Sequence, residues 1–355
     1  MSSKKVIIIG AGLSGLTAAY LLKKAGINAL ILEGRSRTGG RIYTLRGDHT
    51  APVEAGATRL GKKHVHLTAL LKELQLDIFP QHYGRFAVYE PSSLSAAQVV
   101  KLPPDEQPIY RVKGGTSTLT EALAARLDKT QIQLDQTVKT VNFTDTEVIV
   151  RTQNAAYTSD VLISTLPPFL SVKSIGFFPL LPQELTDIAE HTHTWMADSI
   201  KVALTYRKPF WRSGKTSGTI VSNVGPITEM YDHSDATNER YALQGFMNGS
   251  FYSVTKEQRK QLVLSQLEDY YGTAVKDYVN YEEAVWRKEP LTFAEYDTHI
   301  LPHENNGHPA LQKAYFNGRF YLAGAETASS FPGYMDGAVE SASRVCRLII
   351  SRLTD

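Results

Sequence analysis

Apolar residues recur at two different spacings near the start of the chain. Val6–Ile9 is a continuous β-branched run, which is typical of a strand buried on both faces. Residues 16–23 then place apolar side chains at helical spacing, and Asn28–Glu33 is a second apolar run that ends in an acid. Such a β-α-β unit has parallel strands, so the pattern predicts a doubly wound sheet.

The same patterns predict elements along the rest of the chain. Helices are expected at His64–Leu76, Thr118–Leu127, Thr255–Tyr271 and Gly333–Leu353, and strands at Ile132–Thr152 (several short ones), Val161–Thr165, Ser199–Tyr206, Thr219–Ser222, Thr228–Tyr231, Tyr241–Phe246 and Arg319–Ala323. Thr118 with Glu121, and Thr255 with Gln258, have the spacing of a capping box. Residues 79–108 are rich in proline and are predicted to be an irregular surface excursion.

The two ends of the chain differ from its middle. The ends have α/β patterns, whereas the middle has the pattern of a mostly antiparallel sheet with helices. We therefore expect a discontinuous nucleotide-binding domain, residues 1–78, 109–168 and 316–355. A second domain, residues 79–108 and 169–315, is expected to be inserted into it.

Composition narrows the class of protein. The chain has 355 residues, of which 42% are hydrophobic and 21% charged, so it can bury a sizeable core. Lys+Arg 38 against Asp+Glu 36 gives a net charge of +2, which gives no reason to expect a nucleic-acid-binding protein. No apolar run approaches the ~20 residues of a membrane span, and the N-terminus leads into a strand rather than a signal peptide. We expect a soluble, cytoplasmic protein.

Cysteine and histidine residues do not indicate a metal site. Cys346 is the only cysteine, so it cannot form an internal disulfide, and we expect it to be buried in the last helix. His64 with His66, and His191 with His193, have the i, i+2 spacing of one strand face. Both pairs lie in helical or irregular stretches, and we predict no metal ion.

A nucleotide-binding fingerprint follows the first strand. In Gly10-x-Gly12-x-x-Gly15, the glycines permit a tight turn, close approach of the backbone to a pyrophosphate, and close helix–strand packing. Glu33 follows Gly12 by 21 residues and is placed to bind ribose hydroxyls, which disfavours NADP. The fingerprint does not separate FAD from NAD.

Two further glycine-rich stretches extend this site. Gly39-Gly40-Arg41 follows Glu33 closely, and the residues from Gly324 to Ala338 join the last strand to the last helix. A second helix N-terminus directs backbone N–H groups at an anionic or electron-rich group. Two such junctions at opposite ends of the chain indicate a long, extended cofactor.

These blocks together resemble the flavin-containing amine oxidase family, which includes monoamine oxidases, polyamine oxidases and L-amino-acid oxidases. The resemblance covers Val6–Arg41, Val53–Gly61, Lys113–Leu123, Val161–Pro168, Ser199–Trp211 and Phe320–Val339. It implies FAD in an α/β (α+β) fold like that of p-hydroxybenzoate hydroxylase. A Rossmann-like FAD-binding domain and an inserted substrate domain of mixed sheet and helices would have the boundaries given above.

The resemblance also implies which residues lie along the FAD. Glu33 would bind the adenosine ribose, Ser14 would face the pyrophosphate, and Val138 would contact adenine through its backbone. The full predicted set is Gly10, Gly12, Ser14, Gly15, Glu33, Gly34, Arg35, Gly39, Gly40, Arg41, Gly56, Ala57, Thr58, Arg59, Val138, Trp286, Gly324, Glu326, Gly333, Tyr334, Met335 and Ala338.

By the same resemblance, three side chains would carry the chemistry. Lys201 would hold a water at flavin N5, and Tyr296 and Tyr334 would enclose the incoming amine between their rings. Without the resemblance, the alternation with Ile200 and Val202 predicts only a solvent-facing lysine, and most of the 18 tyrosines are expected to be packing residues.

Arg59 leaves two interpretations open. It resembles the arginine with which L-amino-acid oxidases clamp the substrate carboxylate, whereas monoamine oxidases usually have an aromatic residue there. A planar guanidinium suits a carboxylate because it donates two parallel hydrogen bonds. The alternative is an arginine that binds a cofactor phosphate or an acid of the protein.

The chain departs from the family pattern in two places. Glu295 stands where some members attach FAD through a cysteine, so non-covalent FAD is expected. The segment between Leu76 and Lys113 is much shorter than in most members, which leaves substrate entry and range open. No C-terminal membrane-anchor helix is expected after Leu353.

The predicted reaction is oxidation of the C–N bond of a small amine. Hydride equivalents would pass to flavin N5, the imine would hydrolyse, and O2 would reoxidise the flavin to give hydrogen peroxide. The close alternative is an L-amino-acid oxidase that uses Arg59. A desaturase or protoporphyrinogen-type enzyme would share the FAD blocks. A flavin-binding subunit active only with a protein partner would expose an apolar docking patch at the shortened segment.

Overall fold

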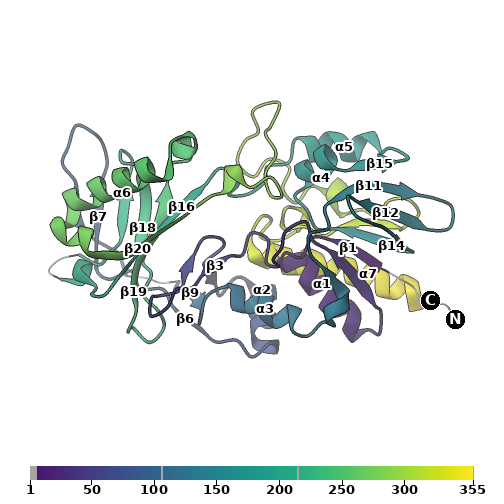
Figure 1. Ribbon diagram of the computed structural model, residues 1–355, viewed down its shortest axis with the longest axis horizontal. Coiled ribbons are helices and arrows are strands. Elements are labelled where there is room, and N and C mark those ends of the chain that lie inside the picture. Colours follow the sequence, from purple (N-terminus) through teal and green to yellow (C-terminus); the bar gives the residue numbers. More distant parts are fainter. Residues whose placement is uncertain (1–5, 105–106, 214–215, 355) are drawn as a thin grey trace.

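The computed structural model describes residues 6–104, 107–213 and 216–354, so residues 1–5 of the predicted nucleotide-binding domain lie outside it. The chain forms two lobes, with both ends of the described chain at the far end of one lobe (Figure 1). Its helices are α1 (Leu13–Lys24), α2 (Val65–Glu73), α3 (Ser117–Ala124), α4 (Pro168–Ser174), α5 (Gln183–Glu190), α6 (Lys256–Tyr271) and α7 (Met335–Thr354). Its strands are β1 (Val6–Ile9), β2 (Ala29–Leu32), β3 (Thr44–Leu45), β4 (Val53–Glu54), β5 (Leu60–Gly61), β6 (Ile78–Pro80), β7 (Phe86–Glu90), β8 (Gln98–Lys101), β9 (Ile109–Val112), β10 (Ile132–Gln133), β11 (Val138–Phe143), β12 (Val148–Thr152), β13 (Ala156–Ser159), β14 (Val161–Ser164), β15 (Gly176–Phe178), β16 (Ile200–Tyr206), β17 (Ile220–Ser222), β18 (Ile227–Asp232), β19 (Tyr241–Met247), β20 (Tyr278–Val285) and β21 (Phe320–Leu322).

A parallel sheet forms the centre of the first lobe. Its strand order is β10-β2-β1-β14-β21, and every neighbouring pair is parallel. The sequence pattern predicted β1, β2, β14 and β21 because each is a short apolar run that is almost entirely buried, whereas β10 at the edge is only half-buried. The β-α-β unit of β1, α1 and β2 is therefore confirmed.

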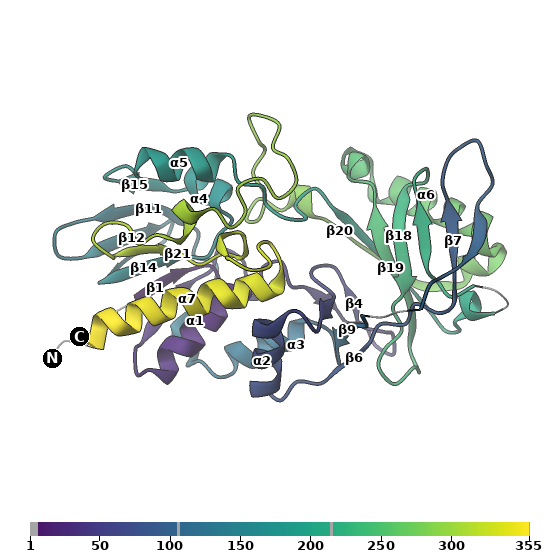
Figure 2. The same cartoon turned by 180° about the vertical axis from the view of Figure 1, so that it is seen from behind.

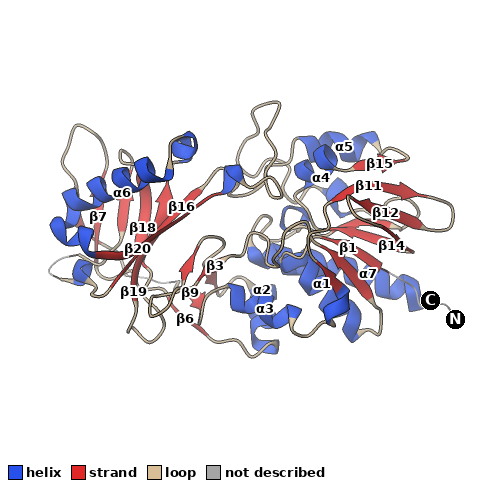
Figure 3. Cartoon of the chain, viewed as in Figure 1, coloured by secondary structure: helices blue, strands red, loops and turns tan. Residues whose placement is uncertain are grey.

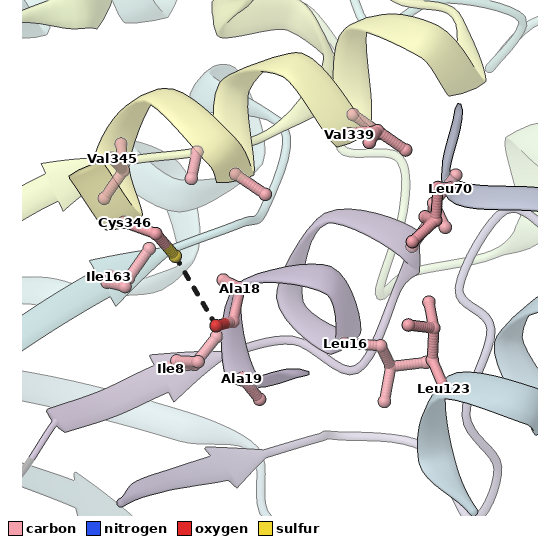
Figure 4. Close-up of a cluster of buried hydrophobic side chains, with 14 of the residues drawn as sticks. Ile8, Leu16, Ala18, Ala19, Leu70, Leu123, Ile163, Val339, Val345 and Cys346 are labelled. Atoms are coloured by element: carbon pink, nitrogen blue, oxygen red, sulfur yellow. Dashed lines mark hydrogen bonds between the residues drawn. The ribbon is translucent and has the colours of Figure 1, made fainter. Parts of the chain in front are cut away.

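The two faces of this sheet are covered differently. Helices α1 and α7 pack on one face, where Ile8 contacts a cluster that includes Leu16 and Val345 (Figures 2 and 4). Cys346 is buried there as predicted; its thiol donates to the Ala18 carbonyl at 3.4 Å, and burial raises its pKa to about 12.

The opposite face carries a second sheet instead of helices. Its order is β13-β12-β11-β15, and β11, β12 and β15 are labelled in Figure 3. Ile7 and Ile9 belong to one buried cluster with its residues Val141 and Val150. The expected doubly wound arrangement, with helices on both faces, is therefore wrong for this face. Alternate side chains of a strand point to one side, so the hairpins of residues 138–159 have an apolar face. This face packs against the parallel sheet in the place where a helix was expected.

The second lobe is built on a seven-stranded sheet of order β20-β16-β19-β18-β17-β7-β8. Helix α6 covers one face with Val263 and Leu267. The capping box of Thr255 and Gln258 at its start is confirmed. The one predicted at Thr118 is wrong, because α3 already begins at Ser117.

The prediction of an irregular excursion over residues 79–108 is wrong. Strand β7 pairs in parallel with β17, and β8 completes a hairpin at the sheet edge. The prolines at 91, 103, 104 and 108 lie outside β7 and β8, so they leave these ladders intact. Strand β20, with the polar sequence YVNYEEAV, was not predicted at all.

Candidate active site

The glycine turn after β1 is closed to side chains. A Cβ on Gly15 would lie 2.0 Å from the Gly10 carbonyl oxygen, and Gly10 itself has φ +100. Gly12 forms a bridge with Gly39, and a Cβ on Gly40, whose φ is +57, would lie 3.2 Å from the Gly12 Cα. The predicted glycines therefore come together at the N-terminus of α1, where backbone N–H groups point outward.

Two hydroxyl groups on the first turns of α1 fit an incoming anion. Ser14 and Thr17 are buried, and neither side-chain oxygen has a hydrogen-bond partner in the described part of the chain. An unpartnered buried hydroxyl at a helix N-terminus is suited to a phosphate oxygen. Together with the glycine turn, these groups fit the pyrophosphate of a dinucleotide.

Glu33 is fixed at the end of β2. Its Oε2 accepts from the Ala11 backbone N–H at 2.7 Å, and its Oε1 accepts from the Arg35 backbone N–H at 2.9 Å. The carboxylate therefore lies beside the glycine turn with acceptor capacity left for ribose hydroxyls. The Arg35 guanidinium donates to the Thr292 hydroxyl at 2.8 Å and to Glu289 at 3.2 Å.

Other predicted cofactor residues lie on several elements of the first lobe. Val138 is buried at the start of β11, and Gly34 packs against Leu291. Gly324 precedes the 3₁₀ turn that carries Glu326, Ala338 is buried within α7, and Met335 begins that helix. Their contacts with a cofactor stay a prediction.

Arg41 and Glu326 join the first and last glycine-rich stretches. The guanidinium donates to both carboxylate oxygens, at 2.5 and 2.8 Å, and Glu326 is fully buried. Burial by itself would lower the pKa of Arg41. The charge of Glu326 and its hydrogen bonds to the guanidinium have the larger effect, so the pKa of Arg41 is raised. Residues far apart in sequence therefore meet in one fixed charged pair.

Lys201 lies in the interior, not in solvent. Its side chain is on the face of β16 opposite Ile200 and Val202, as the alternation predicts, but it is only 6% exposed. The ammonium donates to the Gly56 carbonyl at 2.5 Å and to the Thr58 hydroxyl. Burial lowers its pKa to about 7 and the charge of Arg59 adds to this, while Glu54 opposes it.

Trp286 lies at the same place. Its indole N–H donates to the Ala55 carbonyl at 2.8 Å, next to the stretch Gly56–Thr58 that holds Lys201. Ala57 is half-buried and packs at the edge of the first lobe's core. The structure therefore brings three separately predicted blocks together between the lobes.

The two predicted cage tyrosines are placed differently. Tyr296 accepts a hydrogen bond from the Thr194 N–H at 2.9 Å, and its ring packs edge-on against Phe169 and Phe293. Tyr334 is 39% exposed and follows Gly333, whose φ is +84. Among the described residues, no ring contact joins the two tyrosines.

Trp195 and His193 lie between these tyrosines. The ring of Trp195 is 5.7 Å from that of Tyr334 and 6.1 Å from that of His193, which in turn is 6.4 Å from that of Tyr296. His303 stacks on Trp195 at 3.9 Å. Sequence reasoning missed Trp195, although it is one of only three tryptophans and precedes Lys201 by six residues.

Arg59 reaches across to the second lobe. Its guanidinium lies 3.9 Å from the ring centroid of Tyr231 on β18. Glu54, which sequence reasoning also missed, is buried nearby and accepts from the Thr116 N–H at 2.7 Å. Burial raises the pKa of Glu54, although that hydrogen bond and the charge of Lys201 oppose the shift.

Comparison with known proteins decides the family. A family model described as flavin containing amine oxidoreductase matches residues 13–104 and 86–350. The chain belongs to this family. Its members include amine oxidase (flavin-containing) B of Sus scrofa, which is 25% identical over 460 aligned residues that cover 99% of this chain and 87% of that protein. The probable flavin-containing monoamine oxidase A of Dictyostelium discoideum is 23% identical, covering 98% of each chain.

Solved structures show the same fold. Wild-type putrescine oxidase bound to putrescine has a TM-score of 0.86 and 22% identity, over 98% of this chain and 99% of that one. Cyclohexylamine oxidase from Brevibacterium oxydans also has a TM-score of 0.86, with 19% identity over 99% of this chain and 100% of that one. The predicted two-domain α/β flavoprotein fold is confirmed.

The protein is thus a flavin-dependent amine oxidase. The relatives found are named for amine oxidation, so the amino-acid oxidase alternative is not favoured. No cluster of three or more metal-ligating side chains occurs in the residues the structure describes. None of the helices within those residues has the length and apolar character needed to cross a bilayer.

Proposed function

We propose that this flavin amine oxidase binds FAD non-covalently and oxidises the C–N bond of a small amine with O2 as acceptor. The observation that carries this proposal is the buried Lys201, held by Gly56 and Thr58 between the lobes. Residues 1–78, 109–168 and 316–355 would form the FAD-binding domain, and residues 79–108 and 169–315 the substrate domain.

The residues near the glycine turn are suited to hold the cofactor. Ser14 and the backbone N–H groups of α1 would bind the pyrophosphate, and Glu33 would bind the ribose. Glu295 supports non-covalent binding, because a carboxylate at this position cannot form a thioether. When bound, FAD supplies the oxidising power that takes a hydride equivalent from the carbon bearing the nitrogen.

The protein's own groups orient the substrate and hold a proton at Lys201. With a pKa of about 7, the Lys201 amine exchanges its third proton near neutral pH while it stays bonded to Gly56. Such a group can hold a water molecule and place positive charge where O2 accepts electrons. The aromatic side chains Trp195, Tyr296 and Tyr334 would exclude water and align a neutral amine nitrogen.

The test is an anaerobic titration of the purified protein followed by its visible spectrum. Primary amines, diamines and L-amino acids are added in turn, and bleaching of the flavin by amines is the expected result. Admission of air should restore the spectrum and release hydrogen peroxide. A yellow protein that no amine bleaches would refute the proposal.

Acid precipitation tests the binding mode of the flavin. We expect all of the flavin in the supernatant, where chromatography identifies it as FAD. Yellow colour retained in the protein pellet would refute non-covalent binding. A protein that purifies colourless and takes up no FAD would refute the choice of cofactor.

A further inference from the structure

Glu54 is a buried acid that lies where the two lobes meet. It belongs to β4, and Figure 2 shows this strand between the parallel-sheet lobe and the seven-stranded sheet. The residue is 4% exposed and lines two cavities, one lined also by Lys201 and the other by Arg111. The Lys201 ammonium donates to the carbonyl of Gly56, two residues after Glu54. Glu54 therefore shares a cavity wall with each of two buried cations.

The hydrogen bonds of Glu54 fit an ionised carboxylate. Its Oε1 accepts from the Thr116 backbone N–H at 2.7 Å and from the Thr116 hydroxyl at 3.2 Å. Its Oε2 accepts from the Thr44 hydroxyl at 2.9 Å, and that hydroxyl itself accepts from the Ser117 N–H, so its own proton is directed at Glu54. Burial raises the pKa of Glu54, but donors on both of its oxygens oppose the rise. The ionised form satisfies all of these groups at once.

The three buried charges are hydrogen-bonded to neutral groups and not to one another. The Lys201 ammonium donates to a backbone carbonyl and a hydroxyl. Arg111 donates to the Ser234 carbonyl, and its buried Nε has no partner in the described part of the chain. Charges in the interior are screened less than charges in water, so they act on each other through space. The negative charge of Glu54 therefore favours the protonated form of Lys201.

The other acids near Lys201 are less effective. Glu282 lies on the Lys201 face of the sheet and lines the same cavity, but it is only half-buried, so water screens its charge. Glu283 belongs to the opposite face of β20, and Arg259 forms a salt bridge with it. Glu54 is therefore the main source of negative charge for Lys201.

The remaining charged groups in this region act against Glu54 or lie beyond it. The positive charge of Arg59 favours loss of the Lys201 proton. His233 is fully buried, and burial lowers its pKa well below the ordinary value, so it is neutral near pH 7. Asp235 lines the cavity on the Arg111 side and accepts from backbone N–H groups of its own turn. The charge on Lys201 is thus set mainly by the opposed effects of Glu54 and Arg59.

We propose that Glu54 is a positioning residue that acts through Lys201: its carboxylate is the buried counter-charge that keeps the Lys201 ammonium protonated while O2 accepts electrons. The inference rests on the proposed function, in which O2 reoxidises the flavin. In that step O2 takes two electrons and one proton from the reduced, anionic flavin and one proton from solvent, and leaves as hydrogen peroxide. The ammonium stabilises the negative charge that develops on the oxygen.

The first measurement is the rate of flavin reoxidation by O2 as a function of pH. The FAD-loaded protein is reduced anaerobically with dithionite, so that no amine is needed, and is then mixed with O2 in a stopped-flow instrument. The rate for the wild type should fall as pH rises, with a midpoint at about 7. Glu54→Gln removes the charge at nearly unchanged size and should move this midpoint down by about one pH unit.

Three further variants separate charge from structure. Arg59→Met removes the opposing charge and should move the midpoint up, which a general loosening of the site would not do. Glu54→Asp keeps the charge and should keep the midpoint of the wild type. Glu90→Gln is the matched control, because this carboxylate also accepts two hydroxyl hydrogen bonds but lies on β7, four strands or roughly 19 Å from β16. It should leave the midpoint unchanged.

A second measurement follows the protonation of Lys201 without any reaction. The Cε NMR signal of Lys201 is recorded against pH in FAD-loaded protein that contains isotope-labelled lysine, and it is identified by its loss in Lys201→Met. Its midpoint should fall in Glu54→Gln and rise in Arg59→Met, in step with the reoxidation rate.

The outcomes separate this inference from the proposed function. If no amine bleaches the flavin but the midpoints move as expected, amine oxidation fails and the role of Glu54 stands. If O2 does not reoxidise the flavin at any pH, both fail. If a folded Glu54→Gln protein has the midpoints of the wild type, the role of Glu54 is refuted and the proposed function is unaffected. Should Glu54→Gln not fold, a downward shift of about one pH unit in Glu54→Asp, which keeps the charge, would overturn the inference.

Discussion

Replacing Lys201 with methionine should change how stability depends on pH. The lysine's pKa falls from an ordinary 10.5 to about 7, chiefly because the side chain is buried. In the unfolded chain the group binds its proton up to the higher value. Between these two pH values the unfolded state therefore holds more protons, and the stability of the wild-type protein rises with pH.

The size of the effect follows from the same shift. Each pKa unit corresponds to 1.36 kcal/mol, so keeping the ammonium charged in the interior costs on the order of 5 kcal/mol below pH 7. Lys201→Met removes this cost. The Thr58 hydroxyl still donates to the Gly56 carbonyl at 3.1 Å, so that acceptor keeps a partner. The variant should be several kcal/mol more stable at pH 6.5.

The assay is denaturant unfolding of the cofactor-free protein at a series of pH values from 6.5 to 9.5. We expect the stability advantage of Lys201→Met to shrink by about 1.4 kcal/mol for each pH unit above 7. Lys139→Met, at an exposed position on β11, should follow the wild type at every pH. The comparison is repeated in a Glu54→Gln background, which removes the titration of the neighbouring carboxylate. An advantage that does not change between pH 7 and 9.5 in that background would refute the reasoning.

Three other substitutions test the cofactor site and the scaffold separately. Gly15→Ala places a Cβ 2.0 Å from the Gly10 carbonyl oxygen, so the protein should lose bound FAD. The visible absorbance of the flavin, divided by the protein concentration after desalting, measures this loss. Full retention of FAD would contradict the close packing at Gly15. Glu33→Gln keeps the shape but removes the charge at the ribose position, and should weaken FAD binding about tenfold in a fluorescence titration, whereas an unchanged Kd would exclude Glu33 from the site. Thr255→Ala breaks the capping box with Gln258 and should lower the free energy of unfolding by about 1 kcal/mol. The value of kcat/KM should stay unchanged, and a decrease in kcat/KM would mean that α6 affects the active site.

The elements that sequence predicted well are those whose pattern reflects local physics. Val6–Ile9 is apolar throughout because both faces of its strand are buried. Thr255 caps α6 by accepting a hydrogen bond from the backbone N–H of Gln258, only three residues farther along the chain. The segment 79–108 failed because its strands are stabilised by pairing with a distant strand, β17. Short strands with exposed residues leave little periodicity to detect. Strand β20 is longer, at eight residues, but only its Tyr281 is buried, so it shows no clear alternation either.

The candidate site divides in the same way. The glycine turn and Glu33 could be predicted because their spacing along one β-α-β unit is itself the binding geometry. Trp195 carried no such signal. It becomes significant only through its contact with Tyr334, a residue that a distant segment of the chain supplies.

By itself the sequence determined the family, the nucleotide turn and the alternation that sets Lys201 apart from the core of its sheet. It could not decide whether that lysine faces water or the protein interior, because alternation specifies a face and not what covers it. Only the tertiary structure decided this: the loop after β4 lies over β16, and Gly56 and Thr58 take the ammonium out of solvent. Burial then brings its pKa to about 7, close to neutrality.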